Sequence, residues 1–236
     1  MNAAQKIAGR YAGEQGKIYH DAVHRIPERA IPWLVHLRRE KLSPHVRASD
    51  VVLEYGVGMG WNLAGLTCGR RIGIDVAEHL ESTLESLGIA FVADPARVAD
   101  GSIDVVICHH VLEHIAKPLA ALENMHRMLR DNGSLVLVVP YETGRKYRRY
   151  DPLEPNRHLY SWNVQSLGNL VESTGFRVIE ASLKRYGYDR FAAVWAERLS
   201  LGEMGFRMLR RLLQGLRPLY EVFVVCEKAG TSEEKH

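Results

Sequence analysis

The sequence predicts an α/β fold whose sheet is mostly parallel and covered by helices on both faces. Three observations support this prediction. Short apolar runs alternate with helical segments from residue 51 to residue 139. The first apolar run leads into a turn with three glycines, and the second ends at Asp75. Near-continuous apolar strands separated by helices are typical of a sheet buried on both sides.

The strands of the first half are short β-rich runs, which we expect at 51–55, 71–75, 90–93, 103–108 and 134–139. Helices are expected between them at 61–68, 78–87 and 117–130, with a short irregular stretch near 95–101. The tripeptide Asp131-Asn-Gly133 indicates a helix stop before the fifth strand. The alternation therefore predicts a doubly wound arrangement.

The second half adds a helix, two strands and an insertion. Ser161 could cap a helix over 163–174 that Gly175 ends. The last two strands are expected at 176–183 and 219–227, with a helical insertion over about 190–217 between them. We expect the last strand to be antiparallel, which makes seven strands in all.

The domain organisation follows from these elements. Residues 1–49 are polar with a helical pattern over 31–42, and we interpret them as an N-terminal helical cap. Residues 50–229 form one domain, and residues 230–236 are expected to be a disordered tail.

Composition favours an ordinary globular protein in a reducing compartment. The chain has 236 residues, a formal net charge of +3 and three cysteines. That charge is too small to indicate nucleic-acid binding by itself. The cysteines, Cys68, Cys108 and Cys226, have neither zinc nor disulfide spacing, and the N-terminus lacks an apolar run of signal-peptide length. We therefore expect a cytoplasmic location.

The glycine turn in residues 51–62 (VVLEYGVGMGWN) predicts a nucleotide-cofactor site. A dinucleotide motif would space its glycines as G-x-G-x-x-G, but here they are Gly56, Gly58 and Gly60, followed by Trp61. This spacing weakens an NAD interpretation. Asp75 and Asp94 follow the second and third strands at the edge where such sheets bind ligands, although either could instead cap a helix.

With these motifs the chain resembles class I S-adenosylmethionine-dependent methyltransferases, which have a seven-stranded Rossmann-like sheet. Residues 52–60 are similar to the family's first motif, and Gly73-Ile-Asp75 to its second. The segment 103–114 (IDVVICHHVLEH) resembles the strand-four motif of the branch that methylates small molecules, including quinone precursors and sugars. The segment 129–140 and Thr174-Gly-Phe176 also resemble the family.

The resemblance implies roles for individual residues around S-adenosylmethionine. Glu54 would order the glycine loop and approach the methionine amino group, and Asp75 would hold the ribose hydroxyls. His109 would line the methionine end of the site. The complete set of cofactor-binding residues that we predict is Glu54, Gly56, Gly58, Gly60, Asp75, Val76, Asp94 and His109.

An oxygen or nitrogen acceptor also needs a general base. Candidates on the correct edge of the sheet are His109, His110, Glu142, His158 and Tyr160, of which His109 and His158 are our predicted catalytic residues. Each of these histidines could equally be a surface or structural residue. No set of His, Cys and Asp residues has convincing metal spacing, so we predict no metal.

The basic loop after the fifth strand is the predicted acceptor-binding segment. It could bind a phosphate, pyrophosphate or carboxylate, or it could be a solvated loop. Nucleic-acid binding has thin support from one short loop. The predicted acceptor-binding residues are Arg145, Lys146, Arg149 and Tyr160.

The insertion at 190–217 carries apolar residues at near-helical spacing with arginines between them. It could be a helical cap packed on the domain or on a second copy of the chain. It could also contact a membrane surface and serve an amphiphilic acceptor.

The sequence therefore predicts a methyltransferase for a small-molecule or glycan-type acceptor, with O-methylation expected before N- or C-methylation. Two alternatives stay open. One is a catalytically inactive partner subunit that binds S-adenosylmethionine, and the other is an NAD-dependent oxidoreductase or epimerase.

Overall fold

The computed structural model describes residues 9–14, 16–18, 26–144, 148–152, 154 and 156–229, which contain a sheet of seven strands in the order β3-β2-β1-β4-β5-β7-β6. The strands are β1 (Val51–Tyr55), β2 (Arg70–Ile74), β3 (Ala90–Val92), β4 (Ile103–His109), β5 (Leu129–Tyr141), β6 (Phe176–Tyr186) and β7 (Leu219–Lys228). β7 is antiparallel to both of its neighbours, and the other pairings are parallel. The predicted fold class is therefore confirmed.

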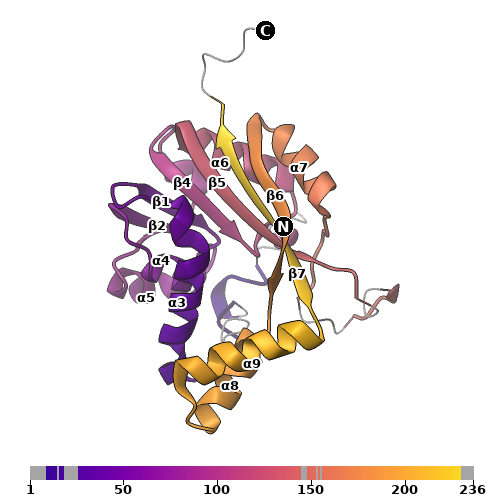
Figure 1. Cartoon of the computed structure of the whole chain (residues 1–236). Coiled ribbons are helices and arrows are strands. Elements are labelled where there is room, and N and C mark those ends of the chain that lie inside the picture. Colours follow the sequence, from indigo (N-terminus) through magenta and orange to yellow (C-terminus); the bar gives the residue numbers. More distant parts are fainter. Residues whose placement is uncertain are drawn as a thin grey trace.

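Helices cover both faces of this sheet (Figure 1). The α-helices are α3 (Ile31–Leu42), α4 (Trp61–Ala64), α5 (Glu81–Ser86), α6 (Pro118–Met128), α7 (Val164–Glu172), α8 (Asp189–Arg198) and α9 (Gly202–Leu216). Single 3₁₀ turns lie at η1 (Glu28–Ala30), η2 (Ser43–His45), η3 (Glu78–Leu80), η4 (Pro95–Arg97) and η5 (Leu112–His114).

An apolar core lies on each face of the sheet. One contains Leu122 of α6 and Leu167 of α7, packed on strand residues such as Leu53. The other contains Leu63 of α4 and Leu84 of α5. Because successive strand side chains point to opposite faces, β1, β4, β5 and β7 each supply both cores.

Several element boundaries differ from the sequence prediction, and two of the differences are large. The helix expected over 117–130 ends at Met128, and β5 begins at once. Ile103 pairs with Leu129 while Val105 pairs with Ser134, so residues 130–133 form a bulge in which Asn132 has a φ of 58°. The helix expected over 61–68 stops at Ala64, with Gly65 as its C-cap; α3 approaches closely here, since a Cβ at Gly65 would lie 2.9 Å from Cγ1 of Val35.

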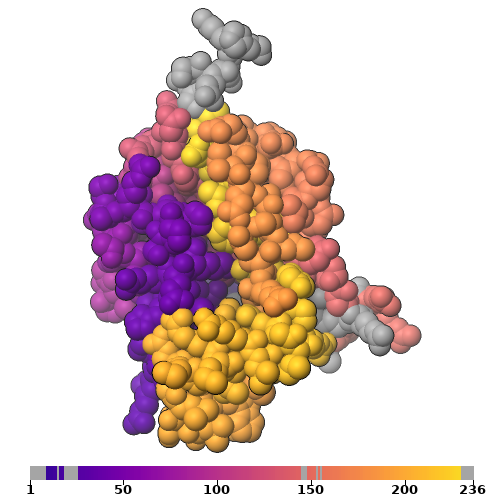
Figure 2. Space-filling view, in the orientation of Figure 1, coloured from indigo at the N-terminus to yellow at the C-terminus, as the bar shows by residue number. Residues whose placement is uncertain are grey.

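The insertion between β6 and β7 is two helices rather than one. α8 and α9 are separated at Ser200, whose φ is 53°, and they lie beyond the carboxyl ends of the parallel strands (Figure 1). They pack against η1 and α3 through an apolar cluster of Ala30, Leu34, Ala192, Ala193, Ala196 and Phe206. Figure 2 shows α3 in contact with this lobe.

Ion pairs reinforce the contact between α3 and the two late helices. Arg38 lies 3.1 Å from Asp189, and Arg207 lies 2.8 Å from Glu40. A surface pair such as Arg207–Glu40 adds little stability, and we take the apolar cluster as the main contact. We call η1, α3, α8 and α9 together the roof, because they cover the edge of the sheet where the strands end.

An apolar stripe runs along the outer side of α9. Met204, Met208, Leu212 and Leu216 recur every four residues and are all exposed, Met204 at 76%. Across the part of the chain that the structure describes, no helix combines the length and the apolar character that crossing a bilayer requires.

Candidate functional site

A cavity of about 1190 Å³ lies between the carboxyl edge of the sheet and the roof. The glycine loop after β1 lines it, as do the residues after β2, β4 and β5. The roof contributes Leu34, Arg38, Asp189 and Arg190. The topology places the ends of the parallel strands here, which is where open α/β sheets bind ligands.

The glycine loop is shaped by left-handed backbone and close approach. Gly56 has a φ of 78°, and a Cβ at this position would lie 2.3 Å from a methyl carbon of Val111. Gly58 also has a positive φ and lines the cavity. Gly60 does not line it, because its φ of 74° turns the chain against Leu84 and Ile89 in the apolar core. The three predicted glycines therefore divide into two at the cavity and one that packs the fold.

Asp75 braces the glycine loop from β2. Its carboxylate accepts hydrogen bonds from the Gly58 N–H at 2.8 Å and from the Ala77 N–H at 3.0 Å. Asp75 and Val76 both line the cavity. Asp94 instead accepts from the Ala96 N–H at 2.9 Å and caps η4, while its neighbours Ala93 and Pro95 line the cavity. The adenine contact predicted for Asp94 stays a prediction.

Glu54 is a buried carboxylic acid at the cavity wall. Its Oε1 accepts a hydrogen bond from Nδ2 of Asn62 at 2.5 Å. Its Oε2 has no hydrogen-bond partner among the described residues. Burial raises the pKa of Glu54 to about 8, against the lowering effect of the Asn62 bond. A buried oxygen without a donor is costly, so this position favours a ligand that brings a cation or an N–H.

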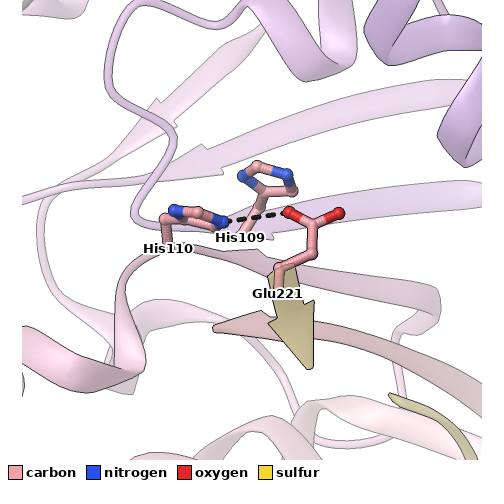
Figure 3. A group of neighbouring side chains, drawn as sticks. All are labelled: His109, His110 and Glu221. Carbon is pink, nitrogen blue, oxygen red and sulfur yellow. Dashed lines mark hydrogen bonds and ion pairs between the residues drawn. The ribbon is translucent and has the colours of Figure 1, made fainter. Parts of the chain in front are cut away.

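The β4–β7 cluster, which we define as His109, His110 and Glu221, lies at the end of β4 (Figure 3). His110 Nε2 donates to Glu221 Oε2 at 3.1 Å, and the two histidine rings stack with centroids 4.6 Å apart. Lys41 Nζ of α3 lies 2.5 Å from Glu221 Oε1. Each carboxylate oxygen of Glu221 therefore has a partner from the chain itself.

His109 Nε2 accepts hydrogen bonds from Lys41 Nζ at 2.9 Å and from Arg38 Nη1 at 3.1 Å. Burial, followed by the Lys41 and His110 charges, holds the pKa of His109 well below its usual range. Burial also lowers the pKa of Lys41 to about 8, although Glu221 opposes this shift. His109 is thus a neutral imidazole whose acceptor nitrogen faces two cations, which is a poor arrangement for a general base.

The η5 cluster, which we define as Glu113, His114 and His158, lies on the same cavity. His158 Nδ1 donates to Glu142 Oε1 at 2.7 Å, and His114 Nδ1 lies 2.9 Å from the Tyr11 hydroxyl. Burial opposes the charged form of His158, but the Glu142 hydrogen bond and charge carry its pKa above the usual value. Burial lowers the pKa of His114 to about 4 and raises that of Glu113.

Of the predicted acceptor-binding residues, the structure describes only Arg149 and Tyr160, and neither lines the cavity. Arg145 and Lys146 lie outside the described residues. Arg149 is exposed. Tyr160 stacks on Trp162 and donates to the Ala116 carbonyl at 3.1 Å. From this part of the chain, the described residues that line the cavity include Glu142, Asn156 and His158.

Sequence reasoning missed Lys41, Arg38 and Glu221 at this site. Each lies far along the chain from the histidine that it contacts: Arg38 and His109, for example, are 71 residues apart. No local spacing carried that information. The available signal was the basic face of the helix 31–42, where Arg38 and Lys41 are three residues apart.

Comparison with known proteins adds the family. A family model described as a methyltransferase domain matches residues 23–181. The chain belongs to this family. A probable S-adenosylmethionine-dependent methyltransferase of Mycobacterium tuberculosis is 28% identical over 144 residues. That match covers 58% of this chain and 52% of the relative, so the chain spans about half the length of the relative.

Solved structures share the fold at low identity. A Thermotoga maritima structure, described as a methyltransferase and possible histamine N-methyltransferase, has a TM-score of 0.62 at 14% identity, covering 94% of this chain and 99% of that one. The [4+2]-cyclase SpnF has a TM-score of 0.60 at 14% identity, covering 83% and 81%. At this identity the likeness shows the fold alone.

The cofactor of the family is S-adenosylmethionine, and the cavity fits it. The unpartnered Oε2 of Glu54 calls for a cation or a donor, which the α-ammonium group of the cofactor offers. Gly56 and Gly58 leave backbone without side chains along the wall of the cavity. Asp75 and Val76 follow β2 on the same wall, where the resemblance expects the ribose and the adenine.

Proposed function

We propose that this chain transfers a methyl group from S-adenosylmethionine to an oxygen atom of a small-molecule or glycan-type acceptor. One observation carries the proposal. The same cavity is lined by the glycine loop with Glu54 and by the η5 cluster with Glu142. A cofactor pocket and a group of proton-accepting side chains thus share one space, as methyl transfer to a hydroxyl requires.

The bound cofactor supplies an activated sulfonium methyl group, so the chain has to align the acceptor and remove its proton. We assign the acceptor side to the η5 cluster rather than to His109. His109 already accepts from Lys41 and Arg38, whereas Glu113 has both carboxylate oxygens without a hydrogen-bond partner among the described residues. A hydroxyl acceptor uses such groups best, because it must lose a proton to become a strong nucleophile.

The acceptor class is inferred from the cavity wall near the roof. Tyr186, Tyr188 and Tyr220 line it together with Arg190 and Arg217. Tyrosine rings offer flat apolar faces with a polar tip, and guanidinium groups suit phosphate or carboxylate. This combination fits a ring-shaped, hydroxylated acceptor that carries an acidic group.

Calorimetric titration tests the cofactor half of the proposal. S-adenosylhomocysteine is expected to bind with micromolar affinity and NAD to give no heat of binding. Glu54→Gln is the matched variant, and we expect it to weaken binding by about tenfold or more, because a charge-assisted pair is lost. Binding of NAD in place of S-adenosylhomocysteine would support an oxidoreductase instead.

Transfer of a labelled methyl group tests the acceptor half. Labelled S-adenosylmethionine is incubated with the protein and a fractionated cell extract, and the labelled product is identified by mass. A labelled ether or ester of a small acidic or glycan-type compound supports the proposal. Cofactor binding without any transfer would favour a partner subunit that does not catalyse the reaction.

We also propose that the 190–217 segment contacts a partner. The exposed stripe of α9 suits a second copy of the chain or a peripheral membrane contact. Sedimentation at rising protein concentration detects the first, and flotation with anionic vesicles at low salt detects the second. A protein that stays monomeric and does not float with the vesicles would contradict both proposed partners.

A further inference from the structure

The η5 cluster brings together three side chains of the kinds that bind metals. One ligand atom from each of Glu113, His114 and His158 lies within 4.8 Å of the others. We infer that these residues bind one divalent transition-metal ion of the zinc class. The role of that ion in activating the acceptor rests on the proposed function, but its binding does not.

The two histidines are oriented as metal ligands usually are. Glu142 holds Nδ1 of His158 at 2.7 Å, and Tyr11 holds Nδ1 of His114 at 2.9 Å. Each ring is therefore fixed through Nδ1, which leaves Nε2 to face the ion. His114 Nε2 lies 4.0 Å from Glu113 Oε1. A second hydrogen-bonded nitrogen that fixes the ring and its tautomer is typical of histidines that ligate metals.

Glu113 is the strongest single indication. Its side chain is 1% exposed, and neither carboxylate oxygen has a hydrogen-bond partner among the described residues. Burying a carboxylate without hydrogen bonds is costly unless a cation compensates it. A divalent ion between Glu113 and the two imidazoles would supply that compensation.

The β4–β7 cluster also contains two histidines and a glutamate, but its glutamate already has compensating cations. Lys41 and His110 already contact the two oxygens of Glu221, and Lys41 and Arg38 contact His109. Two fixed side-chain cations would repel a metal ion. The neighbouring charges therefore favour metal binding at the η5 cluster and oppose it at the β4–β7 cluster.

Hydrogen bonds to two backbone carbonyls hold the residues after His158 next to η5. The Leu159 N–H donates to the Glu113 carbonyl at 2.8 Å, and Tyr160 Oη donates to the Ala116 carbonyl at 3.1 Å. The residues on the C-terminal side of His158 are thus tied to the segment that carries Glu113 and His114. Residues far apart in sequence can then act as one ligand set.

Two imidazole nitrogens and one carboxylate oxygen are a known ligand set of catalytic zinc, which keeps a further position open. A tetrahedral ion at about 2.1 Å from each ligand would draw the three atoms to about 3.4 Å from one another. The open position would face the cavity, where the acceptor hydroxyl binds. The pKa of an acceptor hydroxyl at this open position would fall. The hydroxyl could then lose its proton to water, and its oxygen could attack the methyl carbon as the C–S bond breaks toward sulfur.

Metal binding is tested on the full chain without any assay of activity. The protein is stripped with a chelator, and Zn²⁺ is titrated by calorimetry while Co²⁺ is titrated by visible absorption. We expect one equivalent of either ion to bind, with a cobalt spectrum of imidazole and carboxylate ligation. Glu113→Gln and His158→Asn should each weaken Zn²⁺ binding by about 100-fold or more, and Glu142→Gln by about 10- to 100-fold.

Matched substitutions locate the ion. Glu123→Gln, an exposed change on α6, and Glu221→Gln in the β4–β7 cluster should keep the one-equivalent titration. No binding by the unsubstituted protein would overturn the inference, as would binding that Glu221→Gln removes and Glu113→Gln leaves intact. Titration of S-adenosylhomocysteine into the same variants checks that they are folded.

The same titration separates the two proposals. Zn²⁺ binding without S-adenosylhomocysteine binding would remove the proposed function and leave the metal site. Methyl transfer by a chain that binds no Zn²⁺ would remove the metal site and leave the proposed function.

Discussion

The β4–β7 cluster and the η5 cluster contain the same residue types, yet their electrostatics are opposite. Glu221 is buried with Lys41 at 2.5 Å and His110 at 3.1 Å. Glu113 is buried equally deeply, and its oxygens lack hydrogen-bond partners among the described residues. The chain supplies cations to the first carboxylate, and the second is the one at which we infer a metal ion. Residue type alone therefore does not distinguish a structural ion pair from a binding site.

The largest expected effect is on the completed cluster. Lys41→Met removes the cation from Glu221 and His109, and we expect the free energy of unfolding to fall by about 3 kcal/mol, because a buried carboxylate loses its partner. Urea denaturation at pH 7 measures this. Arg39→Met, an exposed change on the same helix, is the control. Equal losses in the two variants would show that Lys41 does not compensate Glu221.

Glu54 extends the comparison, since it too has a buried oxygen without a partner. Burial raises its pKa to about 8, so it is protonated at pH 7 before the ligand binds. If the cofactor's ammonium group requires the ionised form, binding releases a proton below pH 8. The affinity for S-adenosylhomocysteine should then rise by up to about tenfold, or about 1.4 kcal/mol, per pH unit from pH 6 to 8.

Calorimetry in buffers of different ionisation enthalpy measures that proton release. Glu54→Gln has no proton to release at this position, so its affinity should vary less with pH. A slope that is the same in both proteins would assign the proton to another group.

For Glu113, in contrast to the ion pair of Glu221, we expect a substitution to raise the free energy of unfolding. We expect Glu113→Gln to stabilise the metal-free protein by about 1 kcal/mol at pH 8, because it removes a buried charge without a hydrogen-bond partner among the described residues. Burial raises the pKa of Glu113 above its value in the unfolded chain. The unsubstituted protein therefore loses stability as the pH rises through that pKa, and the advantage of the variant should vanish near pH 4.5.

Thermal unfolding in the presence of chelator, at pH values from 4.5 to 8, measures this difference. Added Zn²⁺ should reverse the order, since an ion at 100 times its Kd stabilises the folded state by about 2.7 kcal/mol. A destabilised metal-free variant would mean that Glu113 has a partner that the structure does not reveal.

The smallest effect concerns the loop that carries His158. Tyr160→Phe removes the hydrogen bond to the Ala116 carbonyl and keeps the ring that stacks on Trp162. We expect a loss of about 0.5 kcal/mol, or a two- to threefold weaker Zn²⁺ titration. Tyr150→Phe, a change of the same kind on an exposed residue, is the control. An unchanged affinity would show that the Leu159 backbone bond alone positions His158.

The sequence predicted the sheet well, because each strand is an apolar run with its own turn signal. The seven runs became β1 to β7, and the spacing of Gly56, Gly58 and Trp61 favoured the correct cofactor class over NAD. The boundary errors arose where tertiary contact overrides local preference. α4 ends where α3 approaches Gly65, and the bulge at Asn132 lets β5 start early.

On the acceptor side, the sequence named His158 and Glu142 as candidates but did not join them to Glu113 and His114, for a physical reason. Glu113 and His114 are adjacent in sequence, but His158 comes from a loop 44 residues further on, and no spacing rule joins them. Likewise, Lys41 and Glu221 meet only because α3 and β7 converge on the end of β4. A pattern shows which side chains share an element, whereas charge compensation depends on elements that meet after folding.

The pairing of α3 with α8 and α9 also orders events during synthesis. Leu34 and Phe206 belong to one apolar cluster, and the chain between them contains most of the sheet. Until the ribosome has released α9, Leu34 of α3 lacks Phe206 as a packing partner, and Lys41 lacks Glu221 until β7 is added. Such distant contacts form slowly, and domains fold as units. A nascent chain that ends before residue 219 would thus carry the glycine loop and the η5 cluster on an open sheet edge, exposed to chaperones and proteases.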